Sequence, residues 1–283
     1  MAYAILLASC PDQKGITAVV TDFIYRRGGN IVDADQHTDI DASVFFIRVK
    51  WELEGFRVSR DRISEEFSSI AKQFSMDWRI AFSDHVPRIA VFVSRHLHCL
   101  YDLWFRHISG HLPCDFRLVI SNHTDAASFC AQSGVDFLHT PVSPQTKDEQ
   151  ELRQLEILAD RQIDLVVLAR YHQILTPAFV ERYSRRIINI HHSFLPAFAG
   201  GSPYAQAYQK GVKIIGATSH YVIPELDQGP IIDQDTVRVT HRDSIADMMR
   251  IGQDLERVVL YKAVRWHLEH KIFCCGNKTV VFD

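Results

Sequence analysis

Two successive patterns of apolar and polar positions run along the chain, and the first occupies residues 3–83. Short apolar runs typical of strands lie at residues 3–9, 30–38, 43–52 and 78–82. Apolar residues at helical spacing fill residues 15–27 and, with Ile63, Phe67 and Ile70, a second segment that reaches Phe74. This βαββαβ order predicts a small ferredoxin-like domain.

The second pattern begins after a polar interruption at residues 84–87, which we interpret as a linker between domains of residues 1–83 and 88–283. Strand-like runs lie at residues 88–93, 116–120, 136–138, 165–168, 187–190 and 214–222. Amphipathic helical segments separate them, and residues 244–270 form one long helical pattern. The alternation predicts an α/β domain with a doubly wound, mostly parallel sheet.

Composition limits the classes of function. The chain has 283 residues, 47% hydrophobic and 23% charged, with a formal net charge of -3, so it gives no electrostatic case for nucleic-acid or anionic-membrane binding. Residues 1–7 are apolar but have no basic flank and are too short for a membrane span. The six scattered cysteines favour free thiols, and we expect a cytoplasmic protein.

Polar side chains interrupt two of the predicted strands where each gives way to a loop. Asn189, His191 and His192 follow buried-strand isoleucines, and His220 lies in a second apolar run that turns before Asp227. An amide, an imidazole and a carboxylate can together orient and deprotonate a nucleophile and stabilise an oxyanion. One such residue is more often structural, but three at two strand–loop junctions favour a site for acyl transfer or hydrolysis.

Imidazoles at 191, 192 and 220 also raise the alternative of a metal site. Adjacent residues in an extended chain project to opposite faces, so His191 and His192 are poorly placed to bind one ion. The spaced His and Cys motifs of zinc sites and a G-x-S-x-G turn are missing from the sequence, and it offers no convincing cysteine nucleophile near a histidine. We therefore expect no metal, and direct attack by water.

Three motifs carry a specific resemblance: NIHHSFLP at 189–196, SHYV at 219–222 and ELDQGPII at 225–232. They closely resemble formyltetrahydrofolate deformylases, within the wider family of formyl-folate transferases and hydrolases. The similarity also covers residues 169–171, 203–204, 252–254 and 276–277. It implies hydrolysis of 10-formyltetrahydrofolate to formate and tetrahydrofolate, which supplies formate for purine biosynthesis and balances one-carbon folate pools.

The resemblance also implies a catalytic trio at Asn189, His191 and Asp227. We expect Asp227 to orient and deprotonate water, Asn189 to donate its amide to the formyl oxygen, and His191 to stabilise the oxyanion and relay a proton. His220 either holds a member of the trio in place or belongs to the core, and both alternatives stay open. No cofactor is implied, because the formyl-folate is the substrate.

The folate itself is expected to lie against the loops at 169–172 and 222–227, whose backbone groups the resemblance assigns to the pterin ring. The candidate substrate-binding residues are Leu168, Arg170, Tyr171, His172, Ile174 and Val222. His172 stands where related sequences usually carry Met, and Gly201-Ser202 where they tend to carry a basic or amide residue. Both departures flank the expected site and bear on affinity more than on chemistry.

The turn at residues 10–16 resembles the first loop of ACT domains, which commonly bind amino acids between paired copies. Asp12 and Gly15 are the candidate effector-binding residues, with Asp12 also a candidate cap of the following helix. Amino-acid sensing and dimerisation without a ligand are both open. Either way, we expect a homo-oligomer, a dimer or a tetramer.

Two alternative functions belong to different classes: formyl transfer to an amine acceptor, and folate binding by a catalytically weak regulator. Transferases of the wider family cradle the phosphate of the acceptor in a glycine-rich turn after the first strand of this domain. Residues 94–100 contain no glycine, which favours water as the acceptor. The complete trio argues against a mere regulator.

Overall fold

The computed structural model of the chain describes residues 1–197 and 203–283, so the departure at Gly201-Ser202 lies outside the described residues. Contacts divide the chain into two compact units. The first comprises Met1–Val86 with two C-terminal segments, His270–Phe273 and Val280–Asp283. The second comprises Pro87–Glu269 and Cys274–Thr279, whereas the sequence pattern placed all of residues 88–283 in one domain.

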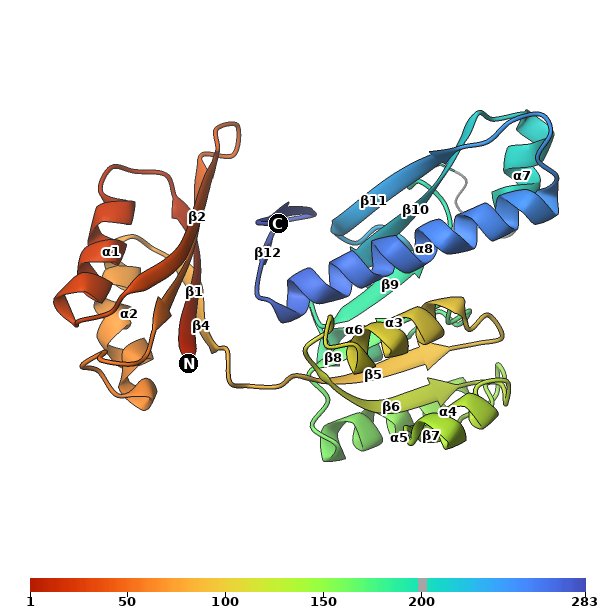
Figure 1. Cartoon of the computed structure of the whole chain (residues 1–283), viewed down its shortest axis with the longest axis horizontal. Helices are drawn as coiled ribbons and strands as arrows, with labels where there is room; N and C mark the ends of the chain where they lie inside the picture. Colours follow the sequence, from red (N-terminus) through yellow and green to blue (C-terminus); the bar gives the residue numbers. More distant parts are fainter. Residues whose placement is uncertain (198–202) are drawn as a thin grey trace. The chain divides into compact units, whose positions relative to one another are not determined.

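The first unit is a four-stranded antiparallel sheet with two helices, in the predicted βαββαβ order. Its elements are β1 (Tyr3–Pro11), α1 (Ile16–Arg26), β2 (Ile31–Asp39), β3 (Val44–Glu52), a 3-10 turn (Arg60–Arg62), α2 (Ile63–Gln73) and β4 (Asp77–Phe82). The strand order is β2-β3-β1-β4, and both helices lie on one side of the sheet (Figure 1).

The core of the first unit lies between these helices and the sheet. Leu6, Val49 and Trp51 of the strands pack with Val20 and Phe67 of the helices, all almost fully buried. Asp12 was a candidate cap of α1, but it does not cap the helix. The N-cap position is Gly15 in the left-handed region (φ 95°), where the helix has no side-chain cap.

The second unit alternates strands and helices. Its strands are β5 (Arg88–Val93), β6 (Asp115–Ser121), β7 (Asp136–His139), β8 (Leu165–Leu168), β9 (Ile187–His191), β10 (Ile214–Tyr221), β11 (Ile231–Arg238), β12 (Ile272–Cys275) and β13 (Lys278–Val281), the last two running partly into the first unit. Its helices are α3 (His98–Ile108), α4 (Ala127–Ser133), α5 (Lys147–Asp160), α6 (Pro177–Arg182), α7 (Pro203–Lys210) and α8 (Ile245–Leu268).

Seven strands of this unit form one mostly parallel sheet in the order β11-β10-β9-β8-β5-β6-β7. The strands from β9 to β7 in that order are parallel, as predicted, but β10 runs antiparallel to both β9 and β11. The sequence analysis did not distinguish the direction of β10 and missed β11. Strand β11 reads IIDQDTVR, and its polar residues suit a partly exposed edge strand more than a buried one.

Helices cover both faces of this sheet. On one face, Leu158 of α5 and Phe179 of α6 pack on Phe92 and Leu168 of the central strands. Helix α8 lies along β9, β10 and β11 and also contacts α3 (Figure 1). A capping box between Ser244 and the third residue of the helix fixes where α8 begins.

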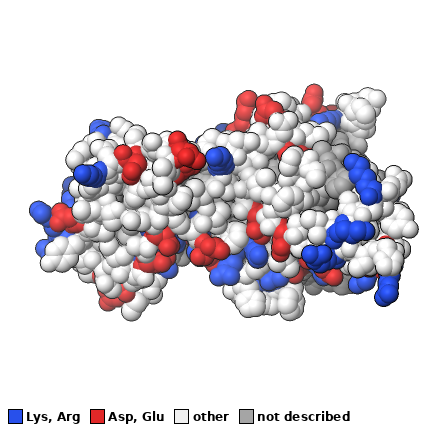
Figure 2. Space-filling view, turned by 90° about the horizontal axis from the view of Figure 1, so that it is seen from above, with Lys and Arg blue, Asp and Glu red and all other residues white. Residues whose placement is uncertain are grey.

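The surface carries charges of both signs, with Lys, Arg, Asp and Glu side chains spread over the face in Figure 2. Among residues 1–197 and 203–283, no helix combines the length and the apolar character that crossing a bilayer requires.

Candidate active site

Strand β9 carries Asn189 and His191 to the edge where parallel strands end. Ile187 and Ile188 anchor it in the core, and its parallel partner β8 ends beside it. Because β10 runs antiparallel to β9, His220 pairs directly with Asn189, and the Asn189 Nδ2 atom lies 3.2 Å from His220 Nε2. Carboxyl ends of neighbouring parallel strands form the usual crevice of open α/β sheets.

A closed loop between β10 and β11 brings Asp227 back to the end of β9. The Tyr221 amide donates to the carbonyl of Pro230 over 2.9 Å, which ties the two ends of the loop together. Gly229, near the end of this loop, packs so closely against Tyr221 that an added Cβ would fall 1.7 Å from the Tyr221 carbonyl oxygen. Asp227 itself is in the left-handed region (φ 55°), an uncommon conformation for a residue with a side chain.

The loop places the Asp227 carboxylate between two imidazoles. Its Oδ2 lies 3.3 Å from His191 Nδ1 and its Oδ1 lies 3.7 Å from His220 Nε2. The structure thus brings together the amide, the two imidazoles and the carboxylate that the sequence placed at two separate strand ends.

The contacts of His220 define its tautomer. Its Nδ1 lies 2.9 Å from the carbonyl oxygen of Tyr221, which can only accept, so Nδ1 carries the hydrogen. In the neutral ring Nε2 is then an acceptor and takes a hydrogen bond from the amide of Asn189. The contact with His220 engages one amide hydrogen of Asn189 and leaves the second hydrogen available.

Hydrogen bonding and charge dominate the protonation of Asp227. Burial alone raises the pKa of its carboxyl, but the hydrogen bond to His191, together with the electrostatic influence of the two neighbouring imidazoles, outweighs burial and holds the pKa well below its ordinary value. Asp227 is therefore a carboxylate throughout the neutral and mildly acidic range. A carboxylate with so low a pKa holds an imidazole firmly but accepts a proton from water poorly.

The second ring nitrogen of His191, Nε2, is not the one that faces Asp227. The residue is only 7% exposed, and its Nε2 is buried with no hydrogen-bond partner among the residues that the structure describes. With Nδ1 directed at Asp227, this nitrogen is the one left to act on a substrate.

These side chains line a cavity of about 300 Å³. All six candidate substrate-binding residues contribute to its wall: Leu168, Arg170, Tyr171, His172, Ile174 and Val222. The loop after β8 is held rigidly, because the His172 amide donates to Ser94 Oγ (3.1 Å) and the Thr176 amide to Glu151 Oε2 (2.9 Å). The sequence therefore located both sides of the cavity.

Comparison with known proteins gives the family. A formyl transferase family model matches residues 87–264. A formyltetrahydrofolate deformylase of Synechocystis sp. is 53% identical over 279 residues, which cover 99% of this chain and 98% of the relative. The chain belongs to the formyltetrahydrofolate deformylase family. It is a hydrolase by this membership.

Solved structures agree with that membership. A formyltetrahydrofolate deformylase from Pseudomonas syringae pv. tomato superposes with a TM-score of 0.97 at 46% identity, covering 100% of this chain and 95% of that one. A glycinamide ribonucleotide transformylase from Symbiobacterium toebii reaches a TM-score of 0.67 at 30% identity, covering 71% of this chain and 97% of that one. The transformylase therefore matches only part of this chain, whereas the deformylase matches all of it.

Three residues of the cavity wall had no predicted place in the site. They are Gln173, Leu175 and Ile190. Two exposed apolar side chains, Ile174 and Leu226, mark the rim and lie on the two loops that face each other. Gln173 and Leu175 continue the predicted loop at 169–172, and this continuity was the available signal.

The geometry of His191 and His192 corrects one step of the sequence analysis. Their rings do not project to opposite faces: the centroids lie 5.2 Å apart with an interplanar angle of 20°. The reason is that β9 ends at His191, so His192 already belongs to the turn. Burial, followed by the charge of Arg170, lowers the pKa of His192 to about 3, which keeps its ring neutral.

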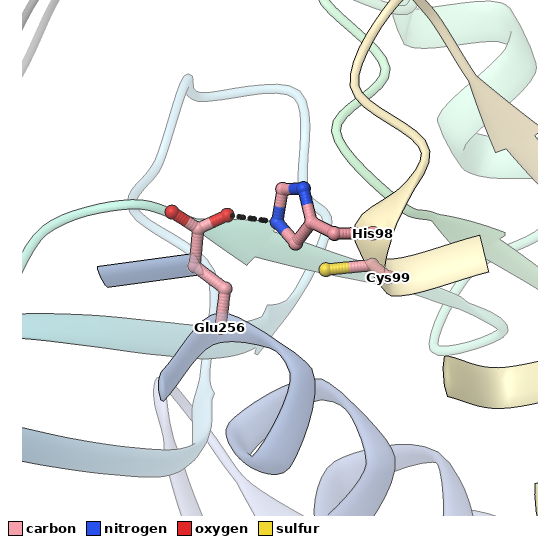
Figure 3. Close-up of side chains that lie close together, drawn as sticks. All are labelled: His98, Cys99 and Glu256. Carbon is pink, nitrogen blue, oxygen red and sulfur yellow. Dashed lines mark hydrogen bonds and ion pairs between the residues drawn. The ribbon is translucent and has the colours of Figure 1, made fainter. Parts of the chain in front are cut away.

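A second buried carboxylate, which sequence reasoning missed, lies on α8. Glu256 is fully buried, and it accepts hydrogen bonds from Tyr204 Oη (2.6 Å) and His98 Nε2 (2.8 Å). Arg170 Nε lies 3.5 Å from the same carboxylate. Figure 3 shows Glu256 reaching from α8 toward His98 and Cys99 at the start of α3, with the three potential ligand atoms within 4.8 Å of one another.

Proposed function

We propose that this chain hydrolyses 10-formyltetrahydrofolate to tetrahydrofolate and formate. The observation that carries the proposal is the convergence of Asn189, His191 and Asp227 on one cavity, in a chain that belongs to the deformylase family. An amide donor, an imidazole and a carboxylate are the groups that hydrolysis of a formamide requires.

The folate is bound in the cavity of about 300 Å³ between two loops. Loops at 169–175 and 222–227 supply backbone groups for the pterin, while Leu168 and Val222 supply apolar walls. Ile174, with more than half of its surface exposed, covers the part of the folate that leaves the cavity. Such a mostly apolar cleft with a few fixed polar groups is typical of small-molecule sites.

Activation of water falls to His191, supported by Asp227. The sequence analysis gave deprotonation to Asp227, but its lowered pKa suits it better to orienting the water and stabilising an imidazolium. His191 Nε2, which has no partner among the described side chains and backbone groups, takes the proton from water as the oxygen attacks the formyl carbon. Asp227 then faces the positive ring across 3.3 Å.

Asn189 stabilises the charge that develops on the formyl oxygen. One of its amide hydrogens is held by His220, so the other is fixed in direction before the substrate binds. The tetrahedral intermediate collapses when the bond between the formyl carbon and N10 breaks and His191 returns its proton to N10. The products are tetrahydrofolate and formic acid, which ionises to formate, and the steps require no cofactor.

The turn after β5 supports water as the acceptor. Its residues carry side chains throughout, and Ser94 at its start is buried and bonded to Asn122 Oδ1 over 2.7 Å. A phosphate cradle needs backbone amides that a ligand can approach closely, and a Cβ at each position prevents this. The alternatives predict other outcomes. An amine acceptor gives a formylated amine, and a weak folate-binding regulator gives little or no product.

The test is formate release from 10-formyltetrahydrofolate, measured with and without glycinamide ribonucleotide. Formate produced at the same rate in both reactions supports the hydrolase. Formylated ribonucleotide in place of formate would make the chain a transferase, and tight folate binding without turnover would make it a regulator.

The first unit is, in this proposal, an ACT-like module that pairs with a second copy of the chain and binds an amino acid. Gly15 opens α1 at φ 95°, where an added Cβ meets no atom within 4 Å, so the glycine leaves open space beside the helix start. Strand β2 bonds only to β3 within its sheet and has mostly exposed side chains. An unpaired edge of this kind is suited to pairing with another chain.

Sedimentation of the full chain tests the pairing. Ala34→Lys places a charge on the exposed edge strand β2, and Ala42→Lys makes the same change in the neighbouring turn. We expect only the first to shift the chain toward a smaller species. Equal sedimentation of both variants and the unchanged chain would argue against pairing through β2.

A further inference from the structure

A second cavity, of about 340 Å³, adjoins the first. The two share three wall residues, Arg170, His172 and His192. The rest of its wall comes mainly from α7 and α8, including Tyr204, Ala205 and Glu256. Nothing in the proposed hydrolysis uses this space, although only one layer of side chains separates it from the reacting groups.

Arg170 is the charged group of the shared wall. Its backbone lies in the left-handed region (φ 64°) just after β8, and its side chain is 9% exposed. Within the described part of the chain, its Nε and Nη1 atoms are buried without a hydrogen-bond partner. A guanidinium cannot lose its proton in a protein, so these N–H groups call for an acceptor.

Glu256 does not satisfy Arg170. Its Oε1 already accepts from Tyr204 and its Oε2 from His98, and the contact between Oε2 and Arg170 Nε is long, at 3.5 Å. The carboxylate thus faces Nε from beyond a normal hydrogen-bond length, and Nη1 has no acceptor among the described residues. The nearby histidines 96, 172 and 192 have lowered pKa values, mainly through burial, and offer neutral rings.

The cavity suits an anion better than a metal cation. The group of His98, Cys99 and Glu256 in Figure 3 has ligand atoms of the right kinds. However, burial, followed by the charge of Glu256, raises the pKa of the Cys99 thiol far above its ordinary value. The fixed positive charge of Arg170, 3.5 Å from the carboxylate, also opposes a cation there.

We propose that the second cavity binds a small carboxylate at Arg170, and that formate leaves the reaction through it. This inference rests on the proposed hydrolysis. When the C–N bond breaks, tetrahydrofolate still fills the first cavity, so formate needs another way out. The Asp227 carboxylate repels the new anion, while Arg170 lies on the wall toward the second cavity.

Direct binding tests the site without requiring turnover. The probe is ¹³C-labelled formate, titrated into the folate-free full-length enzyme and followed by broadening of its NMR signal. We expect saturable binding, at least tenfold weaker in Arg170→Gln and unchanged in Arg182→Gln, a matched change of an exposed arginine on α6. Equal affinity in Arg170→Gln and the unchanged enzyme would overturn the proposal.

A second variant leaves Arg170 in place and fills the cavity. Ala205→Phe adds a ring to a wall residue, and we expect it also to weaken formate binding at least tenfold. This arm decides the question if Arg170→Gln fails to fold, and undiminished binding in folded Ala205→Phe would overturn the proposal. Acetate should displace labelled formate, whereas equally strong displacement by inorganic phosphate would refute the carboxylate class.

Product inhibition tests the exit route. Formate should inhibit hydrolysis noncompetitively with respect to 10-formyltetrahydrofolate, because the two occupy different cavities. Competitive inhibition would place formate in the first cavity and overturn the route. If no formate is released from the substrate, the proposed hydrolysis fails, and the binding titration still decides whether the anion site exists.

Discussion

Asp227 and Glu256 are two carboxylates set among histidines, and they differ in how many of their hydrogen-bonding positions are filled. Glu256 is fully buried and is held by Tyr204, His98 and Arg170. Asp227 keeps 16% of its side chain exposed and faces two imidazoles at 3.3 and 3.7 Å. In both, partners outweigh burial and lower the pKa.

In the proposed mechanism, this difference separates a reactive carboxylate from a structural one. A carboxylate whose oxygens are fully used fixes the elements around it, and α8, α3 and α7 meet at Glu256. A carboxylate with unused positions next to a cavity can act on a substrate. We therefore expect Asp227 to act on the substrate and Glu256 to hold α3, α7 and α8 together.

The largest expected effect is on turnover, from Asp227→Asn. The amide cannot stabilise an imidazolium at His191, so kcat should fall by about 10² to 10⁴ while the melting temperature stays close to that of the unchanged chain. Glu225→Gln, an exposed acid in the same loop, is the control and should keep full activity. A folded Asp227→Asn with near-normal kcat would remove Asp227 from the mechanism.

The next effect is on stability, from Glu256→Ala. It leaves the buried Arg170 without its counter-charge and His98 without its hydrogen-bond acceptor, and the loss of one partner of a buried ion pair typically costs about 3–5 kcal/mol of unfolding free energy. Urea unfolding at pH 7 measures this, with the exposed Asp254→Ala of the same helix as the control. A loss of unfolding free energy no larger than that of the control would show that Glu256 and its partners do not stabilise the fold.

Two glycines give a matched pair for the two sites. An added Cβ at Gly229 would lie 1.7 Å from the backbone of Tyr221, so Gly229→Ala must shift the Asp227 loop, and kcat should fall about 10²-fold. At Gly252 it would lie 2.0 Å from Tyr204 Oη, so Gly252→Ala should break the bond to Glu256 and cost about 1–3 kcal/mol of stability.

Measuring kcat and urea unfolding for both variants sharpens the comparison. We expect kcat to fall further in Gly229→Ala than in Gly252→Ala. In Gly252→Ala, we expect the loss of unfolding free energy to be large compared with the loss of kcat. The reverse assignment would mean that the two carboxylates have exchanged roles.

The smallest effect concerns pH and His192, which borders both cavities. Its pKa is lowered from 6.5 to about 3, so the unfolded chain binds a proton that the folded chain rejects between these values. Stability is fully present above pH 6.5 and falls as the pH drops, by at most about 1.4 kcal/mol per pH unit. His192→Gln should flatten this dependence in urea unfolding between pH 7 and 5, whereas exposed His241→Gln should not.

Sequence reasoning reached the first cavity because its residues break a strong pattern. Asn189 and His191 interrupt a buried strand, and Asp227 follows a second strand in a turn-forming segment. Local pattern and chemistry coincide there. It could not give the direction of β10, since strand direction depends on the path of the chain between β9 and β10 and not on the residues of the strand.

The second carboxylate was missed because it lies within a regular helix. Glu256 falls on the buried face of α8 with Gly252, Val259 and Leu260, where a charge at an apolar position was the available signal. Its partners His98, Arg170 and Tyr204 come from three distant segments. These contacts form only when the chain packs, so the pattern of residues along the sequence does not predict them.

The antiparallel pairing of β10 has a consequence for the order of folding. Asn189, His191, His220 and Asp227 lie on β9, β10 and the loop after β10, with only α7 between the two strands, so their contacts close shorter stretches of chain than those of Glu256. The contacts of Glu256 with His98 and Arg170 close far longer ones, at a greater entropic cost. We expect the reacting groups to assemble early, and α8 to close over Arg170 as a late kinetic step.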